Sequence, residues 1–92
     1  MKKNVYIFTM YGCVYCLELA RNLNDLNIEH TNLRIDKNHH IWAQIVAQTG
    51  CSDVPAVFIT EDSSTGRIIM PERDYQTIEE LIEIIKNEID FK

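Results

Sequence analysis

The sequence has no hydrophobic run long enough to cross a membrane, because no apolar stretch approaches the ~20 residues that a spanning helix needs. Positive charge is also scarce, since 9 Lys and Arg residues stand against 14 Asp and Glu residues and give a net charge of −5. A surface of that sign repels phosphate backbones. We therefore expect a protein that binds neither a membrane nor a nucleic acid.

The chain also lacks features that would divide it into parts. It has 92 residues and no internal repeat, low-complexity tract or linker, so we expect one domain over residues 1–92. Its 46% hydrophobic and 25% charged content is ordinary for a compact fold and argues against disorder. We expect this domain to be a monomer.

No secretory signal of the usual kind is present. Met1-Lys2-Lys3 could begin one, but the apolar stretch that follows is short and no small-residue cleavage site appears. A reducing, cytoplasmic location is therefore expected. In such a compartment three cysteines are rarely a disulfide framework, and they point to catalysis, metal binding or no role.

Short apolar and alternating segments predict four strands. They cover residues 5–10, 30–36, 56–60 and 67–70. The polar segments 61–65 and 72–76 are expected to be loops, and the first of them closes a hairpin between the last two strands.

Three stretches show the spacing of an amphipathic helix. The first ends around Asn27, and the second runs from an N-cap at Asn38 to Gly50. The third begins with a capping box, in which Thr77 and Glu80 each bind the other's backbone N–H. The apolar stripe of the second helix contains Ile41, Trp42, Ile45 and Val46.

The resulting order is β-α-β-α-β-β-α. The first strand-helix-strand unit requires a parallel pair of strands, and the late hairpin adds an antiparallel pair to the same sheet. We therefore expect an α/β fold with a four-stranded mixed sheet flanked by three helices.

The motif Cys13-Val14-Tyr15-Cys16 lies where the first strand gives way to the first helix. Residues three apart on a helix share a face, so the two sulfurs can approach bonding distance. Unpaired N–H groups at the helix start stabilise an anion, and the pKa of Cys13 is expected to fall from ~8.5 to roughly 3.5–7.5. Cys13 is then the attacking nucleophile, and Cys16, on the apolar stripe, resolves the mixed disulfide.

Other uses of this cysteine pair fit the sequence less well. A structural zinc site needs four ligands, but only Cys51 and the adjacent His39-His40 remain, and neighbouring helix positions point ~100° apart. A c-type haem would need His after Cys16, where Leu17 stands. Two inert buried thiols stay open as an alternative. We expect no metal.

The segment that contains this motif resembles the first strand and active-site turn of glutaredoxins. Tyr15 stands where the dithiol motif of that family has tyrosine. Thr49-Gly50 followed by residues 54–59 is similar to the family's segment in which a cis-proline precedes a strand. The resemblance implies a thioredoxin/glutaredoxin-like fold and a cis bond at Val54-Pro55. The backbone N–H and C=O of Val54 would then face the sulfurs and pair with an extended peptide.

The sequence departs from the glutaredoxin pattern where that family holds glutathione. Asp53 replaces the usual Thr, Trp42 a glutamine and Val14 a proline. No Gly-Gly pair follows Gly66, and residues 76–81 are the nearest counterpart. The N–H groups at that helix start are expected to bind a carboxylate.

The resemblance implies a glutathione-dependent thiol-disulfide oxidoreductase that reduces protein disulfides or glutathione mixed disulfides. Glutathione would be the reducing co-substrate, and ribonucleotide reductase one client protein. The catalytic residues are expected to be Cys13 and Cys16. The expected substrate-binding residues are Tyr11, Tyr15, Asp53, Val54, Pro55, Gln76 and Thr77.

Several roles stay open at this point. One alternative function is a thioredoxin-like protein-disulfide reductase recycled by a flavin reductase, and another is a non-catalytic adaptor or iron–sulfur carrier. Cys51 is either a third redox thiol or a small loop residue. Tyr11 either walls the substrate groove or packs, and Trp42 is assigned to the core.

Overall fold

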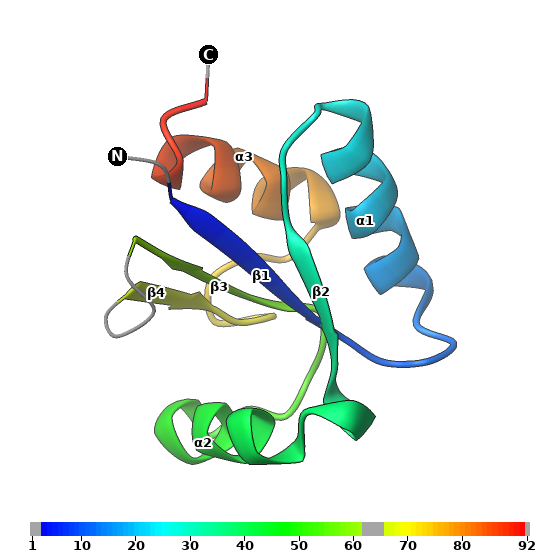
Figure 1. Cartoon of the computed structure of the whole chain (residues 1–92), viewed down its shortest axis with the longest axis vertical. Coiled ribbons are helices and arrows are strands. Elements are labelled where there is room, and N and C mark those ends of the chain that lie inside the picture. Colours follow the sequence, from blue (N-terminus) through cyan, green and yellow to red (C-terminus); the bar gives the residue numbers. More distant parts are fainter. Residues whose placement is uncertain (1–2, 62–65, 92) are drawn as a thin grey trace.

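A four-stranded sheet separates two helical layers in the computed structural model, which describes residues 3–61 and 66–91 (Figure 1). Helices α1 and α3 lie on one side of the sheet, and α2 lies on the other (Figure 1). The elements in chain order are β1 (Asn4–Thr9), α1 (Val14–Asp25), β2 (Thr31–Arg34), the short 3-10 helix η1 (Ile35–Lys37), α2 (His39–Thr49), β3 (Ala56–Thr60), β4 (Gly66–Ile69) and α3 (Ile78–Glu88).

The strand order across the sheet is β2-β1-β3-β4. Strand β1 runs parallel to β2, with Tyr6 opposite Thr31, and antiparallel to β3, with Tyr6 opposite Phe58. Strand β4 completes the antiparallel hairpin with β3. The expected α/β fold with a mixed sheet is confirmed. The expected closing loop at 61–65 falls mostly on residues 62–65, which lie outside the described residues.

Alternation along the strands divides the core between the two faces of the sheet. On β1, Val5 and Ile7 belong to the cluster under α1 and α3, whereas Phe8 belongs to the cluster under α2. The first cluster contains Val5, Ile7, Leu19, Leu23, Ile28, Val57, Ile59, Ile69, Tyr75, Ile78, Leu81, Ile82 and Ile85. The smaller second cluster contains Phe8, Ile45, Ala56 and Met70, with Trp42, Leu33 and Phe58 packed against it.

The helix ends follow the chemistry expected from the sequence. Asn27 takes the left-handed conformation just beyond α1, with φ of 57°. Gly50 closes α2 with φ of 71°, and its N–H donates to the Val46 carbonyl over 2.8 Å. The capping box of α3 is present, since Thr77 Oγ1 accepts the Glu80 N–H and the Glu80 side chain accepts the Thr77 N–H.

Strand β2 is shorter than the predicted 30–36. The chain turns into η1 at Ile35, where Arg34 and Asp36 form a bidentate ion pair and the Asn38 side chain donates to the Arg34 carbonyl over 2.8 Å. Asn38 is the residue that precedes α2, but its side chain therefore makes no cap hydrogen bond. Ile41, assigned to the apolar stripe of α2, is 46% exposed.

Two other strand ends shift by one residue. Met10 was predicted to end the first strand, but its carbonyl accepts the Cys13 N–H and so belongs to the turn that follows. Met70 was predicted to end the last strand, but its N–H donates to the Asp74 carboxylate over 2.8 Å. In both cases a backbone group that could have bonded to a neighbouring strand forms a hydrogen bond within a local turn instead.

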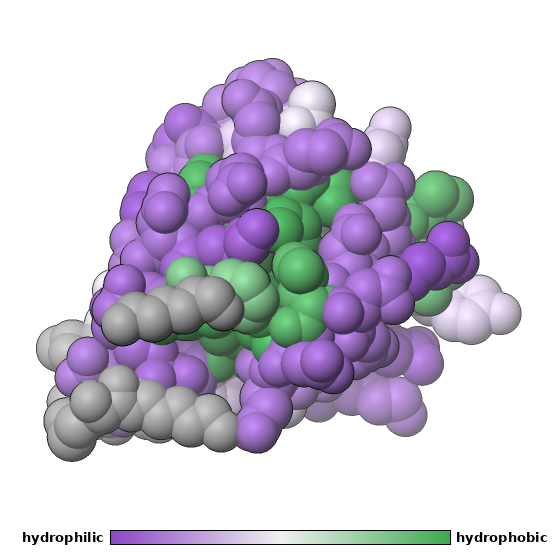
Figure 2. Space-filling model, turned by 90° about the horizontal axis from the view of Figure 1, so that it is seen from above, coloured by the Kyte–Doolittle hydropathy of each residue, from purple (hydrophilic) through white to green (hydrophobic). Residues whose placement is uncertain are grey.

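The surface in Figure 2, seen from above the view of Figure 1, is mostly hydrophilic with a hydrophobic patch near its middle. Within residues 3–61 and 66–91, no helix has both the length and the apolar character that crossing a bilayer requires.

Replacement of Leu81 by Ala tests the packing of α3 on the sheet. Leu81 is fully buried in the larger cluster, so we expect Leu81→Ala to lower the free energy of unfolding by about 2–5 kcal/mol. The matched control is Glu83→Ala on the exposed face of the same helix, which should change it by about 0.5 kcal/mol or less. Urea denaturation of both variants measures the difference, and equal stabilities would contradict the packing described here.

Candidate active site

The turn after β1 places Cys13 at the start of α1. Cys13 is the N-cap residue of α1, its N–H donates to the Met10 carbonyl, and its own carbonyl accepts the Leu17 N–H over 3.2 Å. Gly12 has φ of +77°, a conformation that side chains rarely adopt, although a Cβ there would meet nothing within 4 Å. Glycine is therefore required at this turn by the backbone and not by lack of space.

Cys13 and Cys16 form a disulfide, with 5.2 Å between their Cα atoms. The Cys16 N–H donates to Cys13 Sγ over 3.2 Å. Cys16 is only 4% exposed, whereas Cys13 is partly exposed. The two sulfurs therefore differ as the sequence predicts: the first is reachable from solvent, and a helix-start amide points at it.

The residues before β3 form the wall opposite the cysteines. The peptide bond between Val54 and Pro55 is cis, as the resemblance implied. The Tyr75 hydroxyl donates to the Pro55 carbonyl over 2.5 Å. Tyr75 is 6% exposed, and its burial raises the pKa of the phenol far above its usual range. The hydroxyl thus stays a neutral donor that fixes the cis-proline turn.

A groove of about 930 Å³ lies between these two walls and the start of α3. Seven of the nine predicted site residues line it: Cys13, Tyr15, Asp53, Val54, Pro55, Gln76 and Thr77. Cys16 lies behind them, bonded to Cys13. Tyr15 is 64% exposed in this setting, where burial does not explain an aromatic side chain.

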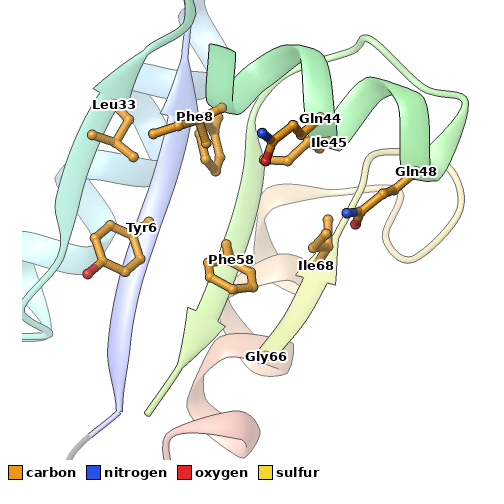
Figure 3. A pocket seen from close by; sticks show the side chains of 10 residues that line it. Tyr6, Phe8, Leu33, Gln44, Ile45, Gln48, Phe58, Gly66 and Ile68 are labelled. Atoms are coloured by element: carbon orange, nitrogen blue, oxygen red, sulfur yellow. The ribbon is translucent and has the colours of Figure 1, made fainter. Parts of the chain in front are cut away.

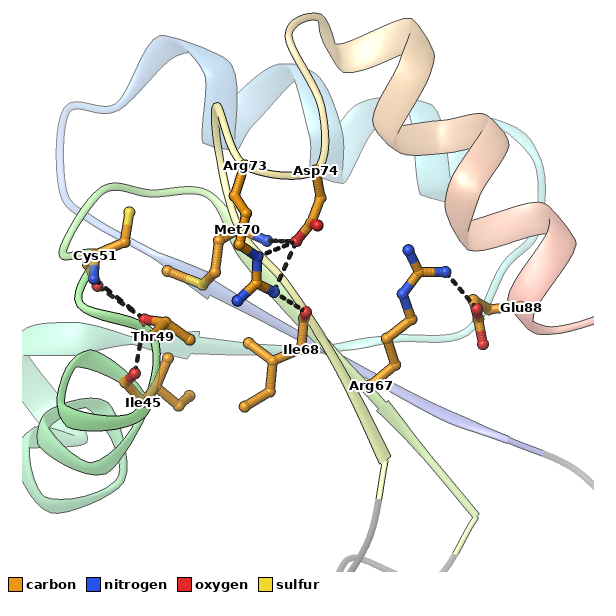
Figure 4. A network of polar contacts seen from close by, with 9 residues as sticks. All are labelled: Ile45, Thr49, Cys51, Arg67, Ile68, Met70, Arg73, Asp74 and Glu88. Carbon is orange, nitrogen blue, oxygen red and sulfur yellow. Dashed lines mark hydrogen bonds and ion pairs between the residues drawn. The ribbon is translucent and has the colours of Figure 1, made fainter.

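Three other residues singled out in the sequence do not themselves line the groove. Tyr11 is 84% exposed and does not line it, and the Arg34 guanidinium lies 5.7 Å from the centre of its ring. Cys51 packs against the smaller cluster, with its N–H donated to Thr49 Oγ1 (Figure 4). Trp42 belongs to the same cluster, 5.6 Å from the Phe8 ring. The assignment of Trp42 to the core is confirmed.

The amides at the start of α3 are already bound to a carboxylate of the chain itself. Glu80 Oε1 accepts the N–H groups of Gln76 and Thr77, over 2.7 and 3.0 Å. The Glu80 N–H in turn donates to Thr77 Oγ1. Both Gln76 and Thr77 precede the first residue of α3, and the binding of a ligand carboxylate by the helix-start N–H groups stays a prediction.

Several residues that line the groove were not predicted as site residues. They are Met10, Val14, Glu18, Pro71, Glu72, Tyr75, Ile78 and Glu79. Tyr75 is the one with a sequence signal that could have been used, since it is an aromatic residue inside the polar segment 72–76. The others become neighbours only when α3 folds back beside the start of α1.

The turn between β4 and α3 is held by Asp74. Its carboxylate accepts the Met70 N–H and hydrogen bonds from Arg73, whose guanidinium also donates to the Ile68 carbonyl (Figure 4). Partial burial opposes ionisation, but the bonds from Arg73 and Met70 outweigh it and lower the pKa of Asp74. This turn carries Tyr75 to the cis-proline wall.

A second groove, of about 660 Å³, lies on the α2 side of the sheet (Figure 3). Tyr6 and Phe58 stack on adjacent strands there, and α2 contributes Gln44 and Gln48. None of the residues that line it is a cysteine. In the described part of the chain, no group of three His, Cys, Asp or Glu residues could hold a metal ion. Of these two grooves, the one at Cys13 contains a member of the cysteine pair.

Comparison with known proteins agrees with this geometry. The model of the glutaredoxin family matches residues 5–63. A buckwheat glutaredoxin in complex with glutathione is similar over 92% of this chain and 70% of its own, with 18% identity and a TM-score of 0.61. A malarial protein is similar over 97% of this chain and 99% of its own, with 15% identity and a TM-score of 0.55. No curated protein matches the sequence.

The J-Trx1 fragment of ERdj5 is also similar, over 97% of this chain and 44% of its own, with 14% identity and a TM-score of 0.54. These likenesses, with the dithiol at a helix start beside a cis-proline, define a thiol oxidoreductase of the thioredoxin fold. Since the family model covers more than half of the sequence, the chain belongs to the glutaredoxin family.

Replacement of Tyr75 by Phe tests the bond that fixes the cis-proline wall. Tyr75→Phe leaves the Pro55 carbonyl without this donor, so we expect the free energy of unfolding to fall by about 1–3 kcal/mol. The control Tyr11→Phe removes an exposed hydroxyl and should change it by about 0.5 kcal/mol or less. Chemical denaturation compares the two, and an equal effect would show that the bond does not hold the wall.

Acid titration of Asp74→Asn tests the turn that carries Tyr75. Because the folded pKa of Asp74 is lowered, its charge stabilises the fold above the unfolded pKa of ~3.9, and this contribution is lost as pH falls through the folded pKa. At pH ~7 we expect the variant to be less stable by about 1 kcal/mol, and the difference should shrink on acidification. Thermal melts across pH measure it, and a gap that is constant with pH would contradict the assignment.

Proposed function

We propose that this protein reduces protein disulfides, or mixed disulfides with glutathione, and that glutathione returns it to the dithiol form. The observation that carries the proposal is the Cys13–Cys16 pair, with the first sulfur at the start of α1 and the second buried behind it. The groove of about 930 Å³ beside Cys13 offers room for a peptide segment.

The reaction is two successive thiol–disulfide exchanges. The Cys13 thiolate attacks one sulfur of the substrate disulfide, a new S–S bond forms, and the other substrate sulfur leaves as a thiolate that takes up a proton. Cys16 loses its proton and attacks Cys13 Sγ, which forms the Cys13–Cys16 disulfide and releases the second substrate thiol. Two electrons pass from the protein to the substrate.

Two molecules of glutathione would then reverse the oxidation of the protein. The first attacks the Cys13–Cys16 disulfide, and the second displaces it, leaving glutathione disulfide and the reduced pair. Membership of the glutaredoxin family and the likeness to the buckwheat glutaredoxin–glutathione complex support this choice of reductant. We place the reaction in a reducing, cytoplasmic compartment, with ribonucleotide reductase as one candidate client.

The cis-proline wall supports a peptide substrate in extended form. Val54 lines the groove beside Pro55 and is only partly buried. An extended segment placed there would pair its backbone with that of Val54 while its sulfur meets Cys13. In this mode of binding the substrate is held through its backbone, and specificity comes from the side chains around the groove.

A second candidate is a thioredoxin-like reductase recycled by a flavin enzyme. It is favoured by the start of α3, where Glu80 occupies the amides of Gln76 and Thr77 that would hold a carboxylate of glutathione. Steady-state turnover with glutathione and, separately, with thioredoxin reductase distinguishes the two. Turnover with the flavin enzyme and none with glutathione would replace the first candidate by the second.

Serine substitutions test the roles of the two thiols. We expect Cys13→Ser to reduce neither substrate, because the attacking sulfur is gone. Cys16→Ser should still reduce a glutathione mixed disulfide, since a second glutathione can resolve the intermediate, but it should lose reduction of a protein disulfide. Glutathione-coupled turnover measures both, with Cys51→Ser as the control that keeps activity. Full activity of Cys13→Ser would refute the proposed function.

A further inference from the structure

The groove at Cys13 is lined by charge of one sign. Four carboxylates line it, from Glu18 on α1, Asp53 before β3, Glu72 after β4 and Glu79 on α3. They come from four separate segments, and three of them are exposed. None of the described residues that line the groove is Lys, Arg or His. A ligand there meets negative charge from every side.

Two arginines of the chain, Arg73 and Arg34, are bound to carboxylates that do not line the groove. Arg73 follows Glu72 directly, but its guanidinium is bound to the Asp74 carboxylate and to the Ile68 carbonyl over 2.6 Å (Figure 4). Arg34 forms its bidentate ion pair with Asp36. Neither side chain is therefore placed to neutralise the four carboxylates.

Two backbone N–H groups just before α3, at the edge of the groove, are already bound to a carboxylate. Glu80 Oε1 already accepts the N–H groups of Gln76 and Thr77, so an incoming carboxylate would have to displace it. An incoming ammonium or guanidinium would instead find carboxylates that are solvent-accessible. The carboxylates that line the groove and the two amides occupied by Glu80 therefore both favour a cationic substrate over an anionic one.

We propose that this groove selects a disulfide that lies in a basic protein segment, with Lys or Arg beside the cysteine, over one in an acidic segment. The inference rests on the proposed function and specifies its substrate class. Met10, Val14 and Tyr15 are exposed apolar residues in the same groove, where the aliphatic stems of Lys or Arg can pack while their charged ends reach the carboxylates.

Two cyclic peptides that differ only in the residues beside their disulfide test the proposal: one carries Lys on both sides and the other Glu. Pre-reduced protein is mixed with each peptide, and acid quenching with mass spectrometry gives the second-order rate constant. Each rate constant is divided by the rate constant for reduction of the same peptide by dithiothreitol. This ratio corrects for the intrinsic reactivity of the disulfide. We expect the Lys peptide to react about tenfold faster or more at low salt, and the ratio to fall towards one at ~0.5 M salt.

Charge-neutralising variants assign the preference to the groove. Glu72→Gln with Glu79→Gln should remove most of the ratio between the two peptides, and because the ratio is taken within each variant, any change in the reactivity of Cys13 itself cancels. Asp25→Asn with Glu83→Gln makes the same change in net charge at exposed positions that do not line the groove, and should keep the ratio.

A ratio near one for the unmodified protein at low salt, or a ratio unchanged in the groove variant, would overturn the proposal. If neither peptide oxidises the cysteine pair, the proposed function itself fails. The single-turnover design makes these results distinct, because it needs neither glutathione nor a recycling enzyme.

Discussion

The hydrogen bond from the Cys16 amide to the Cys13 sulfur is the interaction on which the site depends, and several features of the chain serve to make it. Strand β1 ends at Thr9, and Gly12 supplies the left-handed residue that lets the chain enter α1 with Cys13 at its cap. A thiolate formed there meets amide donors that need no reorganisation. The proposed function therefore assigns the activation of Cys13 to backbone geometry.

The two cores hold the walls of the groove at a fixed separation. The larger cluster ties α1 and α3 to one face of the sheet, and the Tyr75 hydroxyl then reaches the Pro55 carbonyl from the turn before α3. The smaller cluster places α2 on the other face, away from the sulfurs. One layer therefore carries the chemistry, while the other supports the sheet. The carboxylates around the groove oppose a thiolate electrostatically, so the helix amides must supply the larger effect.

Much of this arrangement could be predicted from the sequence because it rests on local rules. Period-two and helical spacing give the element order, Thr77 and Glu80 mark the start of α3, and the cysteine spacing marks the site. The misplaced ends came from local turns, two of which have side-chain partners, such as the Asn38 bond that shortens β2. The acidic groove could not be predicted, because Glu18, Asp53, Glu72 and Glu79 meet only in the folded chain. The capping box predicted that Glu80 would accept the Thr77 N–H, but no pattern showed that it would also accept the N–H of Gln76.

The pH profile of Cys13 alkylation tests the central claim most directly. The reduced protein, with Cys51→Ser to remove the third thiol, is treated with iodoacetamide across a pH series, and mass spectrometry follows the labelling of Cys13. If the amides at the start of α1 stabilise the thiolate, the midpoint of the profile lies below that of free cysteine measured alongside. A midpoint equal to or above that of free cysteine would contradict the account.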